Sequence, residues 1–182
     1  MIYKLNYNKT RRELDVNLVL SKMSKNAYSN IKTILFEKCN SLYFNKNKEQ
    51  SIKYQHMCCI TNISGNIITY GYNVYNSKNN ITEHAEANAL RKLSYKFGID
   101  KTNKKIKINL FIIRLNGYNS KPCIRCINNM INMSDKISIK YIFYTHQDEE
   151  NNNGLRCNKL KDLINDSDKH ICSFDRNKKC KS

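Results

Sequence analysis

Two short motifs bring together residue types that can bind a metal ion and move protons. The first is His-Ala-Glu at residues 84–86, and the second is Pro-Cys-Ile-Arg-Cys at residues 122–126. Cysteines at positions i and i+3 of a first helical turn share a face, so both sulfurs can bind one ion at roughly 2.3 Å. An imidazole nitrogen can bind the same ion at about 2.0 to 2.1 Å. We therefore predict that His84, Cys123 and Cys126 bind one zinc ion, with a fourth position open to water as in catalytic sites.

The charges of this set suit a hydrolytic reaction. Two thiolates and a neutral imidazole balance the two positive charges of zinc, and two helix N-termini at the site favour the thiolates. The pKa of water on such an ion falls from 15.7 towards roughly 7. Glu86 follows a predicted ligand by two residues. There one carboxyl can carry protons between water, a ring nitrogen and a departing amino group, so we predict Glu86 as the catalytic residue and not as a ligand.

Each motif alone has a simpler explanation. A histidine at a helix start is usually a polar cap, and Cys-x-x-Cys can be redox-active or half of a structural zinc site. Here the two motifs occur together, His-Ala-Glu before Cys-x-x-Cys, and each opens a helix after a strand. This combination favours a catalytic site. Pro122, the single proline of the chain, stands at the start of the second helix.

Together the motifs match the His-x-Glu and Pro-Cys-x-x-Cys signature of zinc deaminases, and residues 55–150 resemble the cytidine deaminase superfamily. The run His-Ala-Glu-Ala-Asn-Ala is most similar to the deoxycytidylate branch and related nucleotide branches. The resemblance implies a three-layer α/β/α sandwich with a mixed sheet of about five strands, and a homo-oligomer. It also implies that Asn73, in Gly-Tyr-Asn, contacts the substrate sugar and that the backbone of Ala85 contacts the base. Lys121 stands where many free-nucleoside and transfer-RNA members have Glu, which leaves the substrate open.

Other residues carry weaker signals. Asn73 also fits an ordinary turn after a strand. Arg114 and Tyr144, near strand ends on the expected side of the site, can meet a phosphate or a base, although such residues more often pack at the edge of a core. A second metal site near the end of the chain would have a spacing that is not a recognised one. Its residues would be Cys157, His170, Cys172 and Cys180.

The apolar pattern predicts the elements that position these residues. We expect a helix from Ser24, a strand hairpin, a helix that Thr82 caps and Gly98 ends, a strand, a helix that Pro122 opens, and another strand. The four strands are expected at 55–60, 66–73, 106–115 and 139–145, and the middle helix at 82–97. This order, with a further strand expected after Thr145 in an orientation left open, predicts an α/β architecture.

Length and composition indicate one domain. The 182 residues are 40% hydrophobic, which suits a single domain over 1–182 with its core at about 25–165. No apolar run approaches the roughly 18 to 20 residues of a membrane span, and the start has no long apolar stretch of a secretory signal, so we expect a cytoplasmic protein without membrane partners. In that reducing compartment the eight cysteines are metal ligands or free thiols.

The formal net charge of +17 has two explanations. It favours nucleic acid as a partner, but the abundance of Lys, Asn, Ile and Tyr also follows from a codon preference for A and T. The leading hypothesis is a zinc-dependent hydrolase that deaminates a free cytosine nucleoside or nucleotide and releases ammonia. The alternatives are a deaminase that edits RNA or single-stranded DNA, and a binding module without catalysis. The presence of Glu86 argues against the last.

Overall fold

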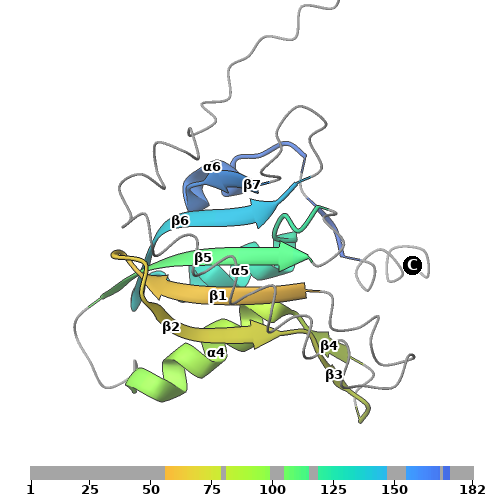
Figure 1. Cartoon of the computed structure of the whole chain (residues 1–182). Coiled ribbons are helices and arrows are strands. Elements are labelled where there is room, and N and C mark those ends of the chain that lie inside the picture. Colours follow the sequence, from red (N-terminus) through yellow and green to blue (C-terminus); the bar gives the residue numbers. More distant parts are fainter. Residues whose placement is uncertain are drawn as a thin grey trace, which may run out of the picture.

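The computed structural model describes residues 56–78, 81–98, 105–114, 119–146, 155–168 and 170–172. Within these ranges a five-stranded sheet carries helices on one face, and a two-stranded hairpin lies beside it (Figure 1). The strands of the sheet are β1 (His56–Asn62), β2 (Ile67–Tyr72), β5 (Ile106–Arg114), β6 (Ile137–Thr145) and β7 (Leu155–Asn158). The predicted helix from Ser24 lies outside the described residues.

The sheet is mixed, and its order is β2-β1-β5-β6-β7. Strand β1 pairs antiparallel with β2 and β5, β5 pairs parallel with β6, and β6 pairs antiparallel with β7. Parallel neighbours need a crossover connection, and helix α5 (Ile124–Asn132) lies in the one between β5 and β6. The α/β architecture and the further strand after Thr145 are confirmed, and the orientation of that strand is antiparallel.

One face of the sheet packs against three helices. These are α4 (Ala85–Phe97), α5 and the short α6 (Leu160–Ile164). Alternate residues of β1 and β5 meet the apolar sides of the helices in one core cluster, since side chains of a strand alternate between its faces. Members of this cluster include Cys58, Ile60, Leu110, Ile112, Leu90, Leu93, Met130 and Leu163.

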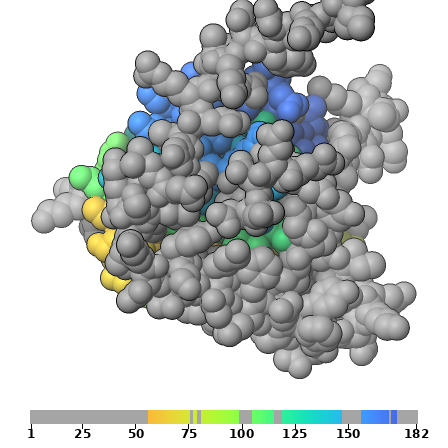
Figure 2. Space-filling model, turned by 45° about the horizontal axis from the view of Figure 1, so that its top comes forward, coloured from red at the N-terminus to blue at the C-terminus, as the bar shows by residue number. Residues whose placement is uncertain are grey.

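The opposite face of the sheet is buried as well. Met57, Phe111 and Phe143 are at most 1% exposed, and the rings of Phe111 and Phe143 stack with centroids 4.4 Å apart. Figure 2 shows the surface from another side, with the β1–β2 turn in yellow and the C-terminal elements in blue. The predicted three-layer sandwich needs a helical layer on this face too, and among the described residues the helices pack on the other face.

The hairpin turn between β1 and β2 is confirmed. The side-chain oxygen of Asn62 accepts hydrogen bonds from the backbone amides of Ser64 and Asn66 at 3.0 and 2.9 Å. Gly65 has a φ of 93°, which an L side chain rarely adopts. The turn therefore depends on the Ser-Gly-Asn chemistry that the sequence shows.

The predicted cap of the middle helix is wrong. Thr82 lies in β4 (Ile81–Glu83), which pairs with β3 (Val74–Asn76) in a hairpin that the apolar pattern did not predict. Thr82 is opposite Tyr75 in this ladder, so its β-branched side chain supports a strand. The helix begins three residues later, with His84 as its N-cap and no side-chain cap.

The predicted end of α4 is confirmed, and α5 begins two residues after Pro122, the predicted start. Gly98 has a left-handed φ of 51° and its backbone N–H meets the carbonyls of Ser94 and Tyr95. Pro122 is not the first residue of α5, because Cys123 has an extended backbone and is the N-cap.

In the part of the chain that the structure describes, no helix has the length and apolar character needed to cross a membrane.

Candidate metal centre and proton carrier

Helix α4 is seated so that His84 lies at its start. The carboxylate of Glu83, at the end of β4, accepts hydrogen bonds from Arg91 Nε at 2.8 Å and from Asn88 Nδ2 at 2.8 Å. These contacts tie the hairpin to the next two turns of the helix. The carbonyl of His84 accepts the first helical hydrogen bond, from Asn88 N–H at 2.9 Å, so the backbone of His84 is fixed at the N-terminal end of α4.

Gly71 in β2 permits a very close approach of α4 to the sheet. A Cβ at this position would lie 2.5 Å from the carbonyl oxygen of Ala85 and 2.9 Å from the Cα of Ala89. Real Cβ atoms essentially never come within 3.0 Å of such atoms. The glycine therefore sets the depth of α4, and with it the depth of His84.

The loop that leads to Cys123 is anchored on two parallel strands. Ser120 is 3% exposed, and its hydroxyl donates to the carbonyl of Ile112 in β5 at 2.7 Å. The same hydroxyl oxygen accepts hydrogen bonds from the backbone amide and the hydroxyl of Thr145 in β6, at 2.8 and 2.7 Å. The segment before α5 is thus held where β5 and β6 both end.

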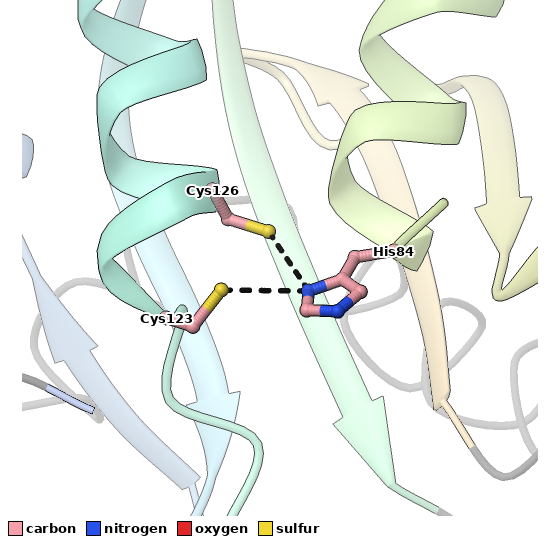
Figure 3. Close-up of side chains that lie close together, drawn as sticks. All are labelled: His84, Cys123 and Cys126. Atoms are coloured by element: carbon pink, nitrogen blue, oxygen red, sulfur yellow. Dashed lines mark hydrogen bonds between the residues drawn. The ribbon is translucent and has the colours of Figure 1, made fainter. Parts of the chain in front are cut away.

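The three predicted ligands come together between the two helix starts (Figure 3). The Nδ1 atom of His84 lies 3.4 Å from Sγ of Cys123 and 3.3 Å from Sγ of Cys126. All three atoms lie within 4.8 Å of one another. A nitrogen and a sulfur that share a tetrahedral zinc are about 3.6 Å apart, so the cluster fits that ion.

Hydrogen bonding within the cluster shifts the pKa values of the two thiols in opposite directions. The hydrogen bond from Cys126 lowers the pKa of Cys123, and the neighbouring His84 ring lowers it further. In turn, the interaction with Cys123 and burial raise the pKa of Cys126. The hydrogen bond to Cys123 raises the pKa of His84. A thiolate is therefore stabilised beside a positive group, which is the electrostatic setting that a bound cation would provide.

Glu86 lies in the first turn of α4 with its side chain buried. The residue is 5% exposed, and burial raises the pKa of its carboxyl above the ordinary range of glutamate. Cys126 is among the groups that influence this pKa through a hydrogen bond, which places the carboxyl next to the ligand cluster. A raised pKa makes a carboxylate a better proton acceptor, which suits a group that carries protons.

The two residues expected to contact substrate lie together. The side-chain oxygen of Asn73 accepts a hydrogen bond from the backbone N–H of Ala85 at 2.9 Å. Asn73 therefore satisfies the first amide of α4, where a cap is ordinarily needed. This contact replaces the cap that we expected from Thr82.

A cavity of about 790 Å³ opens beside the cluster, within the size range of small-molecule sites. Its lining includes His84 and Cys126, together with Ala87, Arg91 and Asn129 of the two helices. Glu86 and Asn73 do not line it. The cavity therefore reaches the cluster from between α4 and α5.

The weaker candidates are not among the atoms that can share one ion. Tyr144 is 4% exposed and donates a hydrogen bond to Asn158 Oδ1 at 2.8 Å, so it belongs to the core. Arg114 ends β5, where it is paired with His56 of β1. Among the described residues, the group of histidine, cysteine and acidic side chains that can share one ion is His84, Cys123 and Cys126. Cys180, which the second metal site would need, lies outside the described residues.

Sequence reasoning missed His56 and the partners of Lys121. Burial, and then the charges of Arg114 and His84, lower the pKa of His56 to about 4. Lys121 contacts two aspartates from the end of the chain. A lone histidine at a strand start has no spacing that singles it out, and no motif predicts the partners of Lys121.

The model of the cytidine and deoxycytidylate deaminase zinc-binding region matches residues 37–142, which is more than half of the chain. Among solved structures, the chain is similar to a dCMP deaminase from the cyanophage S-TIM5 in apo form. The identity is 20%, the match covers 59% of this chain and 78% of that chain, and the TM-score is 0.34. A comparison with curated proteins finds no match. The family match includes both motifs, and the chain belongs to the cytidine and deoxycytidylate deaminase zinc-binding family.

Proposed function

We propose that this protein catalyses the zinc-dependent hydrolytic deamination of a cytosine nucleoside or nucleotide. The products are the uracil form and ammonia. The observation that carries the proposal is the position of His84 Nδ1, 3.3 and 3.4 Å from two sulfurs, with the buried carboxyl of Glu86 in the first turn of the same helix. Family membership supports this reaction class.

In the proposed site His84, Cys123 and Cys126 hold the zinc. When bound, the ion lowers the pKa of a water molecule and so supplies a nucleophile near neutral pH. The three side chains have little freedom to move, because both cysteines are 3% exposed and the histidine lies at the tightly seated start of α4. A site held in this way needs little rearrangement when the metal binds.

Glu86 is the proposed proton carrier. Its carboxylate takes a proton from the attacking water and delivers it to the ring nitrogen of the cytosine. It then transfers the second proton of the water to the amino group, which leaves as ammonia, and the oxygen of the water becomes the new carbonyl oxygen. The raised pKa of the buried carboxyl supports this role, since a proton carrier works best when its pKa is close to the working pH.

Asn73 and Ala85 are the proposed substrate contacts. Their mutual hydrogen bond of 2.9 Å keeps the end of β2 and the start of α4 in one arrangement. A sugar held by the first residue and a base held by the second would then have a set distance between them. Such positioning supports the chemistry, because small misplacements of a substrate cost large factors in rate.

The net charge of +17 favours a second candidate, deamination of a base in RNA or single-stranded DNA. We therefore suggest one assay with two arms. Purified protein is incubated with cytidine, deoxycytidine, their monophosphates and a transfer RNA, and ammonia is measured at increasing salt. A free nucleotide as substrate predicts little change with salt, whereas an enzyme that contacts several phosphates of a polynucleotide loses activity steeply. No ammonia from any substrate would contradict both candidates.

A further inference from the structure

The end of the described chain lies against the segment that enters α5. Residues 166–168 and 170–172, which we call the C-terminal strap, meet this segment at two points. The ammonium of Lys121 contacts Asp166 Oδ2 at 3.0 Å and donates to the carbonyl of Asp168 at 2.6 Å. The backbone N–H of Ile124 donates to the carbonyl of His170 at 2.9 Å. Cys123 lies between Lys121 and Ile124, so the strap holds the chain on both sides of a predicted ligand.

The contact between Lys121 and Asp166 is shielded from water. Their side chains are 10% and 13% exposed, so solvent screens this pair less than a surface pair. The carboxylate of Asp168 is 90% exposed and 4.0 Å away, and it adds little. Asp166 Oδ1 also accepts the amide of Asp168 at 2.9 Å, which sets the shape of the strap around the ammonium.

The far end of the strap is fixed in the core. Cys172 is 6% exposed and belongs to the same cluster as Cys123, Cys126 and Ile127. The strap is therefore attached at Lys121, at the first residue of α5 and in the core beneath it. Because the strap is held at these three points, it limits the movement of the residues that it contacts.

We propose that Lys121 is a positioning residue that ties the C-terminal strap to the metal-binding loop and so sets the place of the two sulfurs relative to His84. The proposal rests on the proposed function, because it concerns the same metal site. Pro122 separates Lys121 from Cys123, and its ring fixes one backbone angle, so a displacement at Lys121 carries over to the cysteine. Ser120 holds the earlier part of this loop, and Lys121 holds the later part.

The charge of Lys121 is matched to the strap. A glutamate at this position would place its carboxylate beside that of Asp166, and like charges at this distance repel. The lysine and the aspartate therefore form one unit in this chain, and exchanging one of them alone breaks it.

The test measures zinc affinity directly, with a chelating dye as competitor, at a temperature far below the unfolding midpoint of every variant. We expect Lys121→Met and Asp166→Asn each to weaken zinc binding by about tenfold or more, the range seen when groups that orient ligands are changed. The double variant should bind zinc no more weakly than the weaker-binding single variant, because the two substitutions remove the same contact. Lys161→Met, the same change at an exposed position of α6, is the matched control and should bind zinc like the parent.

Cobalt absorption and hydrogen exchange complete the test. The proposal expects altered d–d bands of the cobalt-loaded Lys121→Met protein, and it is overturned if both single variants match the parent in zinc affinity and in cobalt spectrum. If Lys121→Met does not fold, Asp166→Asn, which keeps the side-chain size, decides by the same criteria. If the parent itself binds no zinc, the proposed function fails, and exchange of the Ile124 amide then decides. Faster exchange in Lys121→Met than in the parent and Lys161→Met supports the tie, and equal exchange overturns it.

Discussion

In the proposed mechanism, Glu86 and the three proposed ligand side chains have separate tasks, although the carboxyl lies beside one of them. The atoms that can share one ion belong to His84, Cys123 and Cys126, and the carboxyl of Glu86 is a neighbour of Cys126. Metal binding and proton transfer are therefore separable by single substitutions. Loss of the proton carrier should leave the cluster intact, whereas loss of a sulfur should not.

We expect Glu86→Gln to keep the zinc and to lose turnover. The amide has the size of the carboxyl but cannot accept and return a proton, and general acid–base catalysis contributes typically 10² to 10⁴-fold. The loss of kcat should be on the order of a thousandfold or more. Zinc content and ammonia release, measured on the same preparation, check this. A variant as active as the parent would remove Glu86 from the mechanism.

Cys126→Ala should lose the metal. Only two of the three side chains remain, and neither the histidine nor the single thiolate holds zinc in the geometry of the cluster. Cys157→Ala is the matched control, because Cys157 is another buried thiol, 3% exposed, in β7. Zinc content after dialysis should fall for the first variant only. Equal zinc in both variants would mean that Cys126 is not a ligand.

His56 should make the fold sensitive to acid. Its pKa is lowered from 6.5 to about 4 by burial and then by Arg114, so the folded protein holds the neutral ring. The stabilisation is complete above the unfolded value and is lost as pH falls from 6.5 towards 4, where the unfolded chain takes up the proton first. Replacing His56 by Gln should remove up to about 3 kcal/mol of this pH dependence. Urea unfolding of both proteins at pH 4.5, 5.5 and 7 would reveal it, and parallel curves would contradict it.

At the scale of elements, the site depends on how closely α4 lies on β2. Two lysines of the helix reach across this contact, with Lys92 Nζ 3.2 Å from the carbonyl of Tyr70 and Lys96 Nζ 2.9 Å from that of Ile68. They cover the backbone of a strand that has one partner in the described sheet. Gly71 follows Tyr70 in this strand and provides the space for Ala85 and Ala89. The start of α4 is thus set by packing and not by a side-chain cap.

Gly71→Ala should therefore displace α4 and weaken zinc binding. The new Cβ would meet backbone atoms at 2.5 and 2.9 Å, which cannot move as a flexible side chain would. Overpacking of this kind costs typically about 1 to 3 kcal/mol. Gly98→Ala is the comparison, because Gly98 is the C-cap at the other end of the same helix. It should lower stability by about 1 kcal/mol without changing zinc affinity. Thermal unfolding and zinc competition separate the two effects, and unchanged zinc affinity in Gly71→Ala would contradict the role of this glycine.

The sequence pattern predicts elements well where one periodicity dominates. The turn residues between β1 and β2, the long apolar run of β5 and the spacing of Leu90 and Leu93 in α4 each have one simple interpretation, and the elements that they predict are confirmed. The short β3–β4 hairpin was missed because three-residue strands show too little alternation. Thr82 was misread for a related reason, since it suits both a helix cap and a strand.

At the scale of the whole molecule, the cluster joins segments far apart in the chain. His84 lies 39 residues before Cys123 and 42 before Cys126, and the sheet order brings them together. The motifs predict which residues belong together because their chemistry is specific. The residues that support them, such as Asn73 at the first amide of α4 or the strap near Lys121, follow from three-dimensional contacts that no spacing reveals.

Because the proposed metal joins two helix starts on one face of the sheet, its removal should lower the stability of the whole domain. A ligand that binds only the folded state adds about 2.7 kcal/mol at a concentration 100 times its Kd and about 4.1 kcal/mol at 1,000 times. We expect a chelator to lower the Tm of the parent and added zinc to restore it. Cys126→Ala should already have the lower Tm and should respond to neither addition. If the parent and this variant respond alike, any stabilising zinc lies elsewhere, because only the site between α4 and α5 contains Cys126 among its proposed ligands.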